Sequence, residues 1–127
     1  MTSIFYSVCG GKLIATGNKQ YISTPNFPQD YPPHIDCKWE IEASRADLHV
    51  SLNFISFNVE ADSRCRFDYA RVQSPNGTAS PITLCGKLSN IRTIHSEANK
   101  MIVEFESDYA ITPAGFNASF FSRKNQQ

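Results

Sequence analysis

The sequence predicts an all-β protein in which two antiparallel sheets pack face to face. Apolar and polar residues alternate over four segments, which is the period of a half-buried strand. Clusters of proline, glycine, asparagine and serine separate these segments. No segment shows a sustained helical period. Short alternating strands with frequent turns are typical of a β-sandwich.

Four strands are predicted, and within each strand the apolar residues are two positions apart. In chain order these residues are Trp39, Ile41 and Ala43; Leu48, Val50, Leu52 and Phe54; Met101, Val103 and Phe105; and Phe116, Ala118 and Phe120. Turns are predicted at residues 23–28, 31–33, 74–77 and 112–115. His49 falls on the polar side of the second strand, so we expect it at the surface.

Length and composition predict one globular domain without a charge-driven partner. A chain of 127 residues buries about two thirds of its unfolded surface and builds one core. Hydrophobic residues make up 41%, and nine Phe, five Tyr and one Trp supply a packed interior. Twelve basic residues balance twelve acidic ones, so the net charge favours neither nucleic acid nor an anionic membrane. No apolar run is long enough for membrane insertion, and residues 1–8 lack the features of a secretion signal.

Four cysteines, Cys9, Cys37, Cys65 and Cys85, are more typical of disulfides than of a metal site. Zinc sites take pairs of cysteines two to four residues apart, and these cysteines are far more widely spaced. Four cysteines allow three pairings, and the spacing alone does not choose between them. The sequential pairing would close two short loops, each stabilising by about 3 kcal/mol in the chain-entropy model.

Several short motifs together resemble the CUB domain. In chain order they are Cys9-Gly10-Gly11, residues 23–28 with Tyr31-Pro32, Cys37 to Ile41, Glu60, Cys65 to Asp68, Leu84-Cys85-Gly86, Phe105 to Asp108, and Gly115-Phe116. Each motif is weakly specific alone, whereas the ordered set extends from Cys9 to about Phe121. The resemblance implies a jelly-roll-like sandwich with two disulfides, Cys9–Cys37 and Cys65–Cys85. It divides the chain into an N-terminal flank (1–8), a CUB domain (9–122) and a C-terminal tail (123–127).

The resemblance also implies a calcium site. Glu60, Asp68 and Asp108 match the carboxylates of the calcium-binding CUB domains, and Tyr31 matches their supporting tyrosine. Three carboxylates in one place raise one another's pKa unless a cation neutralises them, and calcium prefers oxygen ligands. Backbone carbonyls of Ala110 and Ile111 are the further ligands expected. The family often has Ser or Asn where this chain has Ala110, so the site lacks one side-chain oxygen.

Two simpler interpretations of these acids stand beside the calcium site. Most exposed Asp and Glu side chains are solvated loop residues, and Asp62, close to Glu60, is expected to be one of these. A bound metal could also stiffen the loops without taking part in recognition.

In function, the resemblance implies a non-catalytic interaction module of a secreted protein or of the extracellular part of a cell-surface protein. In many CUB domains a Lys or Arg of the protein partner reaches the calcium-site carboxylates, forming charge-assisted hydrogen bonds. We therefore expect Asn58, Glu60, Asp68, Asp108 and Tyr109 to contact an extracellular partner, with Ile111 at the rim. CUB domains also flank the catalytic domains of astacin-like and complement-type proteases, where this chain would supply an exosite.

A spermadhesin-like domain that binds glycans or glycosaminoglycans is the alternative to protein recognition. The basic residues available for such a patch are Arg64, Arg66, Lys87, Arg92, Lys100, Arg123 and Lys124, which are spread along the sequence. An enzyme is not favoured, because the chain lacks the common nucleophile, zinc and phosphate-binding motifs. The sequons at Asn76 and Asn117 predict glycosylation, which fits an extracellular location.

Overall fold

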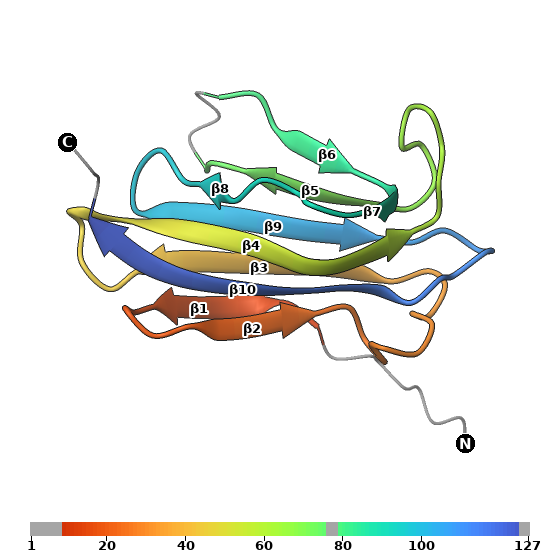
Figure 1. Cartoon of the computed structure of the whole chain (residues 1–127), viewed down its shortest axis with the longest axis horizontal. Helices are drawn as coiled ribbons and strands as arrows, with labels where there is room; N and C mark the ends of the chain where they lie inside the picture. Colours follow the sequence, from red (N-terminus) through yellow and green to blue (C-terminus); the bar gives the residue numbers. More distant parts are fainter. Residues whose placement is uncertain (1–8, 76–78, 125–127) are drawn as a thin grey trace, which may run out of the picture.

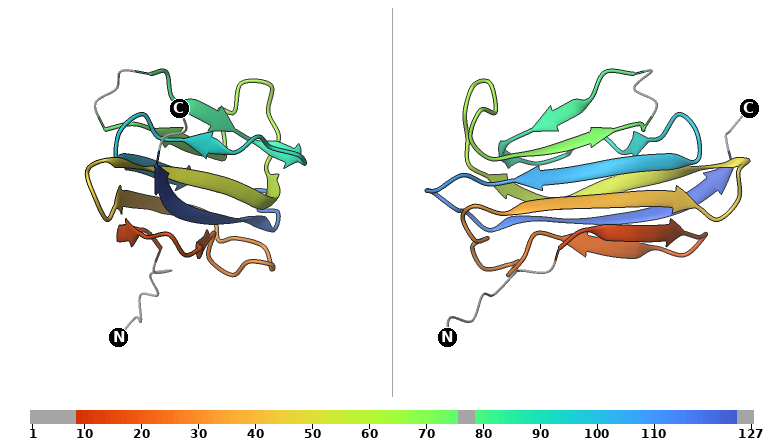
Figure 2. Two further views of the ribbon diagram at one scale, coloured as in Figure 1. Left: turned by 60° about the vertical axis from the view of Figure 1, so that its left-hand side comes forward. Right: turned by 180° about the vertical axis from the view of Figure 1, so that it is seen from behind.

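The structure is a two-layered β-sandwich. The computed structural model describes residues 9–75 and 79–124, and these residues form ten strands and no helix. The strands lie in two stacked layers with their long axes roughly aligned (Figure 1, Figure 2). The all-β sandwich expected from the alternating pattern is therefore confirmed. Within the described part of the chain, no helix could cross a membrane.

Each layer is a sheet of five strands. The first sheet has the order β1 (Gly11–Ala15), β3 (Asp36–Ala43), β9 (Lys100–Glu106), β5 (Tyr69–Gln73) and β6 (Ile82–Leu84). The second has the order β2 (Gln20–Ser23), β10 (Gly115–Lys124), β4 (Leu48–Val59) and β7 (Gly86–Leu88), with β8 (Ile94–His95) also paired to β4. The β1–β3 pair is parallel, from Gly11 opposite Trp39 to Ala15 opposite Ala43, and the other pairs are antiparallel.

The four predicted strands correspond to β3, β4, β9 and β10. These are the long central strands, in which alternate side chains enter the core, as the buried-exposed alternation along β3 shows. The other six strands are at most five residues long and lie mainly toward the sheet edges, so they carry too few buried residues to produce a recognisable period. β10 continues through Arg123 and Lys124, which fall in the expected tail.

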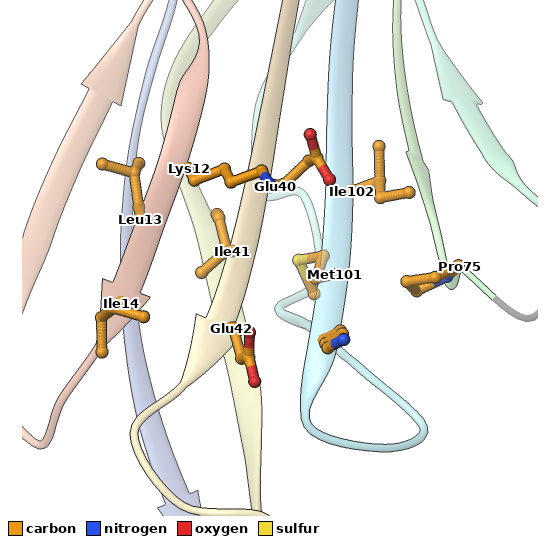
Figure 3. Close-up of a pocket in the computed structure, with 10 residues that line it drawn as sticks. Lys12, Leu13, Ile14, Glu40, Ile41, Glu42, Pro75, Met101 and Ile102 are labelled. Carbon is orange, nitrogen blue, oxygen red and sulfur yellow. The ribbon is translucent and has the colours of Figure 1, made fainter.

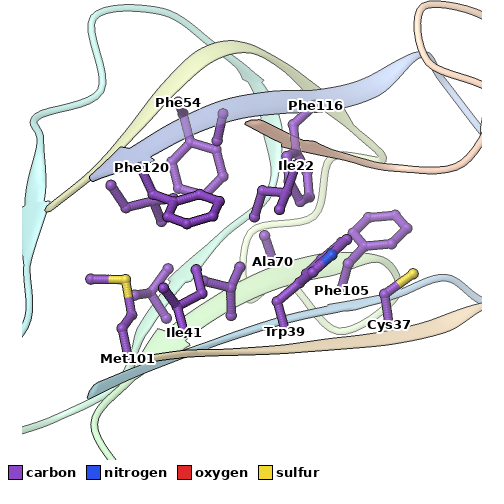
Figure 4. Packing of buried hydrophobic residues seen from close by; sticks show 14 of the residues in the cluster. Ile22, Cys37, Trp39, Ile41, Phe54, Ala70, Met101, Phe105, Phe116 and Phe120 are labelled. Carbon is purple, nitrogen blue, oxygen red and sulfur yellow. The ribbon is translucent and has the colours of Figure 1, made fainter. Parts of the chain in front are cut away.

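The core lies between the two sheets and is rich in aromatic rings (Figure 4). Phe116 on β10 is its centre, because its fully buried ring lies 5.2 Å from Phe54, 5.9 Å from Trp39 and 5.8 Å from Phe105, centroid to centroid. Trp39 and Phe105 belong to the first sheet and Phe54 to the second. One side chain therefore links both layers close to the end of the sandwich where β10 begins.

His49 corrects one expectation of the sequence analysis. It lies on β4 between inward-facing neighbours, as its place on the polar side predicted, but only 6% of its surface is exposed. The reason is β8, which pairs with β4 and brings the His95 ring within 5.4 Å of the His49 ring. A short strand that the sequence did not reveal thus lies beside β4 and places the His95 ring against His49.

Both disulfides join cysteines that are consecutive in the sequence. Cys9 is bonded to Cys37, which ties the start of the described chain to β3. Cys65 is bonded to Cys85, which ties the loop after β4 to the junction of β6 and β7. The pairing is the one that the CUB resemblance implied, and there is no free cysteine.

Candidate metal centre

Two loops that each join the two sheets meet at one end of the sandwich. β4 ends at Val59, directly before Glu60, and β5 begins at Tyr69, directly after Asp68. β9 ends at Glu106, and its pairing with β5 places Glu106 opposite Tyr69. Antiparallel pairing therefore brings the end of β9 beside the start of β5, at the right-hand end in Figure 1. Side chains far apart in the sequence become neighbours there.

The three predicted carboxylates converge in this place. One carboxylate oxygen from each of Glu60, Asp68 and Asp108 lies within 4.8 Å of the others. Asp68 is fully buried, while Glu60 and Asp108 are half-buried. Within the described residues, no Lys or Arg forms an ion pair with any of the three. The cluster is therefore a partly buried concentration of carboxylates without an ion-paired Lys or Arg among the described residues.

Tyr31 connects two of these carboxylate residues. Its hydroxyl donates to Asp68 Oδ2 at 2.5 Å and accepts a hydrogen bond from the Glu60 backbone N–H at 3.1 Å. The other oxygen of Asp68 accepts from the Asp108 backbone N–H at 2.7 Å. Asp68 thus joins the loop after β9 to Tyr31. The family resemblance implied a supporting role for Tyr31 at a metal site, and that role stays a prediction.

Without a bound cation, the pKa values of two of these carboxyl groups, Glu60 and Asp68, are raised. Burial raises the pKa of Glu60, and the negative charges of Asp68 and Asp108 raise it further. Burial also raises the pKa of Asp68, although hydrogen bonds from Tyr31 and from the Asp108 N–H act in the opposite direction. Both shifts mean that the folded protein disfavours the charged carboxylates, which a nearby positive charge would reverse.

One oxygen of the cluster lacks a partner. Glu60 Oε1 is buried and accepts no hydrogen bond from the described residues. Most buried polar atoms in folded proteins are hydrogen-bonded, so such an atom calls for a ligand or a solvent molecule. A set of carboxylate oxygens with an unsatisfied member suits a hard cation such as calcium, which prefers oxygen ligands. The residues present therefore fit a calcium ion.

The loop after β9 carries Asp108 and the two residues whose carbonyls were expected to bind metal. The Asp108 carbonyl accepts from the His34 N–H at 2.8 Å, and Asp108 Oδ1 accepts from the Ala110 N–H at 3.2 Å. Ile111 follows with a positive φ of 52° and is largely exposed. The backbone thus folds around the Asp108 side chain, while metal coordination by Ala110 and Ile111 remains a proposal.

Besides Ile111, the expected partner contacts outside the acidic cluster are Asn58 and Tyr109, and both lie at the same end. Asn58 is next to the last residue of β4, opposite Gly115 on β10 and Lys87 on β7, and is half-buried. Tyr109 follows Asp108 and is 77% exposed. An aromatic ring this open beside an acidic cluster is available for contact with a partner.

Asp62 differs from the solvated neighbour that the sequence predicted. Only 8% of its side chain is exposed, and its carboxylate is engaged within its own loop. Asp62 Oδ2 accepts from the backbone N–H groups of Arg64 and Arg66, both at 3.0 Å, and the Arg66 guanidinium donates to both carboxylate oxygens at 2.9 Å. Sequence reasoning missed this role, because nothing in a loop sequence marks a four-residue spacing as an ion pair.

The basic residues considered for glycan binding do not gather in one place. Arg64 and Arg66 lie in the loop after β4, whereas Lys124 and Lys100 lie at the opposite end, opposite Leu48 on β4 and Glu42 on β3 respectively. The twelve residues of β4 separate these ends by about 40 Å at the usual rise of a strand. The structure thus distributes these charges over both ends.

A cavity of about 260 Å³ lies away from the acidic cluster, on the outer face of the first sheet (Figure 3). Its walls come from β1, β3 and β9, with Pro75 at one side. The lining residues are Lys12, Leu13, Ile14, Glu40, Ile41, Glu42, Pro75, Lys100, Met101 and Ile102. Lys100, considered above for glycan binding, is one of them, whereas the residues of the acidic cluster are not.

The two expected glycosylation sites differ in what the structure describes. Asn76 lies outside the described residues. Asn117 lies on β10 between β2 and β4, half-buried, with its Oδ1 atom inaccessible to solvent. Whether either asparagine carries a glycan stays a prediction.

A two-layered sandwich, two disulfides and an acidic cluster at one end define a small disulfide-linked β-sandwich module. The sequence model of the CUB domain matches residues 9–120. The chain therefore belongs to the CUB domain family. A CUB domain is a non-catalytic module, although relatives of this chain include larger proteases.

The chain is similar to parts of two much longer proteins and to one structure of a single CUB domain. It is 33% identical to human tolloid-like protein 1 over 126 residues, which covers 98% of this chain and 12% of that protein. Its fold matches the full extracellular region of zebrafish Gpr126/Adgrg6 with a TM-score of 0.83 and 30% identity, over 92% of this chain and 15% of that one. It also matches the MASP-1 CUB2 domain bound to Ca²⁺, with a TM-score of 0.72 and 23% identity, over 89% and 99% of the two chains.

Proposed function

We propose that this CUB domain binds one calcium ion through Glu60, Asp68 and Asp108 and uses the calcium-bound loops to recognise an extracellular protein. The observation that carries the proposal is the convergence of three carboxylates within 4.8 Å, with no ion-paired cation among the described residues. The buried Glu60 Oε1 atom, which accepts no hydrogen bond, supports it. The MASP-1 CUB2 domain, which has the same fold, was solved bound to Ca²⁺.

Calcium would supply the positive charge that the cluster lacks. This chain's own residues then do the positioning: Tyr31 holds Asp68 and the Glu60 backbone, and Asp68 holds the Asp108 backbone. The loops that carry these residues come from both sheets. A shared ion would therefore fix their relative positions and form a defined surface at this end of the sandwich.

A basic side chain is the partner group that suits this surface best. A Lys or Arg from the partner protein would form charge-assisted hydrogen bonds with carboxylate oxygens, and such bonds are stronger than neutral ones. Tyr109, being largely exposed, and Asn58 are placed to contact the residues around that basic side chain. Calcium would then control recognition, because it sets the positions of the carboxylates that receive the partner.

The site of action that we propose is extracellular, in a secreted protein or in the outer part of a cell-surface protein. Two disulfides are typical of oxidising compartments. The chain spans only 12% of tolloid-like protein 1, so an exosite role within a larger protease is compatible with the same interaction surface. Glycosaminoglycan binding is less favoured, because the basic residues are divided between the two ends of the sandwich.

Calorimetric titration of calcium into chelator-treated protein tests the first part of this proposal. We expect one saturable site in the wild type and little or no binding in Asp108→Asn, which keeps the side-chain shape but removes the charge. Asp47→Asn is the matched control, since Asp47 is an exposed carboxylate directly before β4, at the far end of the sandwich. Wild-type protein that takes up no calcium would refute the proposed function.

The capture of a basic group is tested separately by NMR titration with Nα-acetyl-lysine amide. We expect amide shifts around Glu60, Asp68 and Asp108 in calcium and none in chelator, and no response to the uncharged norleucine analogue. Calcium binding without any response to the lysine probe would refute basic-group capture and leave the calcium site standing. Salt-sensitive retention on heparin in the presence of chelator would favour the glycosaminoglycan alternative instead.

A further inference from the structure

Two of the three cluster carboxylates sit at the ends of one loop. Glu60 directly follows β4 and Asp68 directly precedes β5, so the loop between them joins the two sheets. A loop that carries two ligands must hold both in place, because every residue it leaves mobile has to be ordered when the ion binds. The hydrogen bonds within this loop should therefore affect the affinity of the site for calcium.

Asp62 is the centre of those internal bonds. Its carboxylate accepts from the backbone N–H groups of Arg64 and Arg66 and from two nitrogens of the Arg66 side chain, all between 2.9 and 3.0 Å. Its backbone carbonyl accepts from the Cys65 N–H at 3.1 Å. The Arg66 guanidinium also lies over the Phe67 ring, 5.5 Å from its centroid. These bonds give the loop one compact shape.

Asp62 is not itself a member of the cluster. The carboxylate group that could hold a metal comprises Glu60, Asp68 and Asp108, and both oxygens of Asp62 are directed to Arg66. The pair is two-pronged, a geometry in which guanidinium and carboxylate fit each other specifically. Both oxygens of Asp62 are thus engaged by the contact that shapes the loop.

We propose that Asp62 and Arg66 act as a clamp that positions Glu60 and Asp68 for calcium. The inference rests on the proposed calcium site and adds to it two positioning residues that touch neither the ion nor the partner. Groups that orient metal ligands commonly change metal affinity by about tenfold or more when they are removed. The clamp predicts a loss of that kind from either residue.

The direction in which Arg66→Ala changes calcium affinity distinguishes loss of the clamp from a purely electrostatic effect. Removing a positive charge close to the site would by itself strengthen calcium binding, because it leaves the surroundings more negative. Loss of the clamp weakens binding, because the loop must then be ordered by the ion. Asp62→Ala does not discriminate, since loss of a negative charge and loss of the clamp both weaken binding.

The test measures calcium affinity by calorimetry on the whole chain with both disulfides intact. We expect Arg66→Ala and Asp62→Ala each to weaken binding by about tenfold, and Arg66→Lys, which keeps the charge but not the two-pronged contact, to fall between them and the wild type. Arg45→Ala and Asp47→Ala are the matched controls. They break an exposed Arg–Asp pair of the same kind, 2.6 Å long, at the far end of the sandwich.

Amide hydrogen exchange in metal-free protein reports on the clamp without calcium. We expect Asp62→Ala to speed the exchange of the Arg64 and Arg66 amides, which donate to Asp62. Unchanged or tighter calcium binding by Arg66→Ala, or unchanged exchange at both amides, would overturn the clamp while leaving the proposed function intact. Wild-type protein without calcium uptake would overturn the proposed function and the positioning role together.

Discussion

The Tyr31 hydroxyl donates a hydrogen bond to Asp68 at 2.5 Å, although 37 residues separate the two in the sequence. Both side chains are buried, and the same hydroxyl accepts from the Glu60 backbone. Tyr31 therefore reaches two residues of the acidic cluster from a loop that supplies no carboxylate to it. The contact connects the loop after β2 with the loop between β4 and β5.

Tyr31→Phe removes this hydroxyl and little else. Asp68 Oδ2 and the Glu60 N–H would then be buried without their partner, which costs about 1–3 kcal/mol. We expect that loss in the free energy of unfolding by urea in the presence of chelator, together with weaker calcium binding. Tyr21→Phe is the control, because 64% of Tyr21 is exposed. Equal stability of the two variants would contradict a structural role for the Tyr31 hydroxyl.

Gly115 allows close contact with Thr24 at the base of the loop that carries Asp108. A Cβ at position 115 would lie 2.0 Å from Thr24 Oγ1, and the φ of +86° strains any L side chain. Thr24 Oγ1 also accepts from the Phe116 N–H. We expect Gly115→Ala to destabilise the domain by more than about 1 kcal/mol, measured by thermal unfolding.

Gly17→Ala is the control for that substitution. A Cβ at Gly17 meets nothing within 4 Å, and its backbone does not require glycine. We expect its melting temperature to equal that of the wild type or exceed it slightly. A Gly115→Ala variant as stable as Gly17→Ala would show that the contact with Thr24 is not needed.

Phe116 is the aromatic residue whose loss should cost most. Its ring contacts rings from both sheets, and it is fully buried. Phe116→Ala leaves a cavity at the centre of the core, so we expect a loss of about 3–5 kcal/mol in unfolding free energy. Ile55→Ala on the outer face of β4, where the side chain is exposed, should cost less than about 1 kcal/mol. A similar loss in both variants would argue against the core described here.

Removal of either disulfide should lower the stability of the domain by a similar amount. The two removals should differ in how much they lower calcium affinity. In the chain-entropy model each stabilises by about 3 kcal/mol, because they close loops of 28 and 20 residues. Only Cys65–Cys85 constrains the loop between Glu60 and Asp68. We therefore expect the Cys65→Ser, Cys85→Ser double variant to lose more calcium affinity than the Cys9→Ser, Cys37→Ser double variant. Equal affinities would mean that the disulfide does not support the site.

The long strands could be predicted from the sequence because their apolar residues alternate with polar ones along the chain. The alternation from Leu48 to Phe54 identified β4, since every second side chain enters the core. β1 and β2 have too few buried residues for a period, with only Ala15 and Ile22 inside. The burial of His49 was missed for a different reason, namely that the neighbouring strand β8, which supplies the His95 ring, has just two residues.

The candidate site was predictable in its acids and not in the contacts that hold them. Glu60, Asp68 and Asp108 were recognised from an ordered family pattern. Such a pattern implies which residues lie close together in the fold, whereas their spacing in the sequence does not. Asp62 is not part of that family pattern, and an aspartate in a polar loop is predicted to be solvated. Its engagement with Arg66 depends on the path of the loop, which the turn at Cys65, with a positive φ of 50°, helps to set.

A crystal structure of the chain grown in calcium would show directly whether the three carboxylates bind the ion. We expect one ion at the end of the sandwich, with oxygens of Glu60, Asp68 and Asp108 at about 2.3–2.6 Å from it. The Asp62–Arg66 pair should remain formed beside it. An ion bound elsewhere, or three carboxylates without an ion at saturating calcium, would rule out a calcium site at Glu60, Asp68 and Asp108.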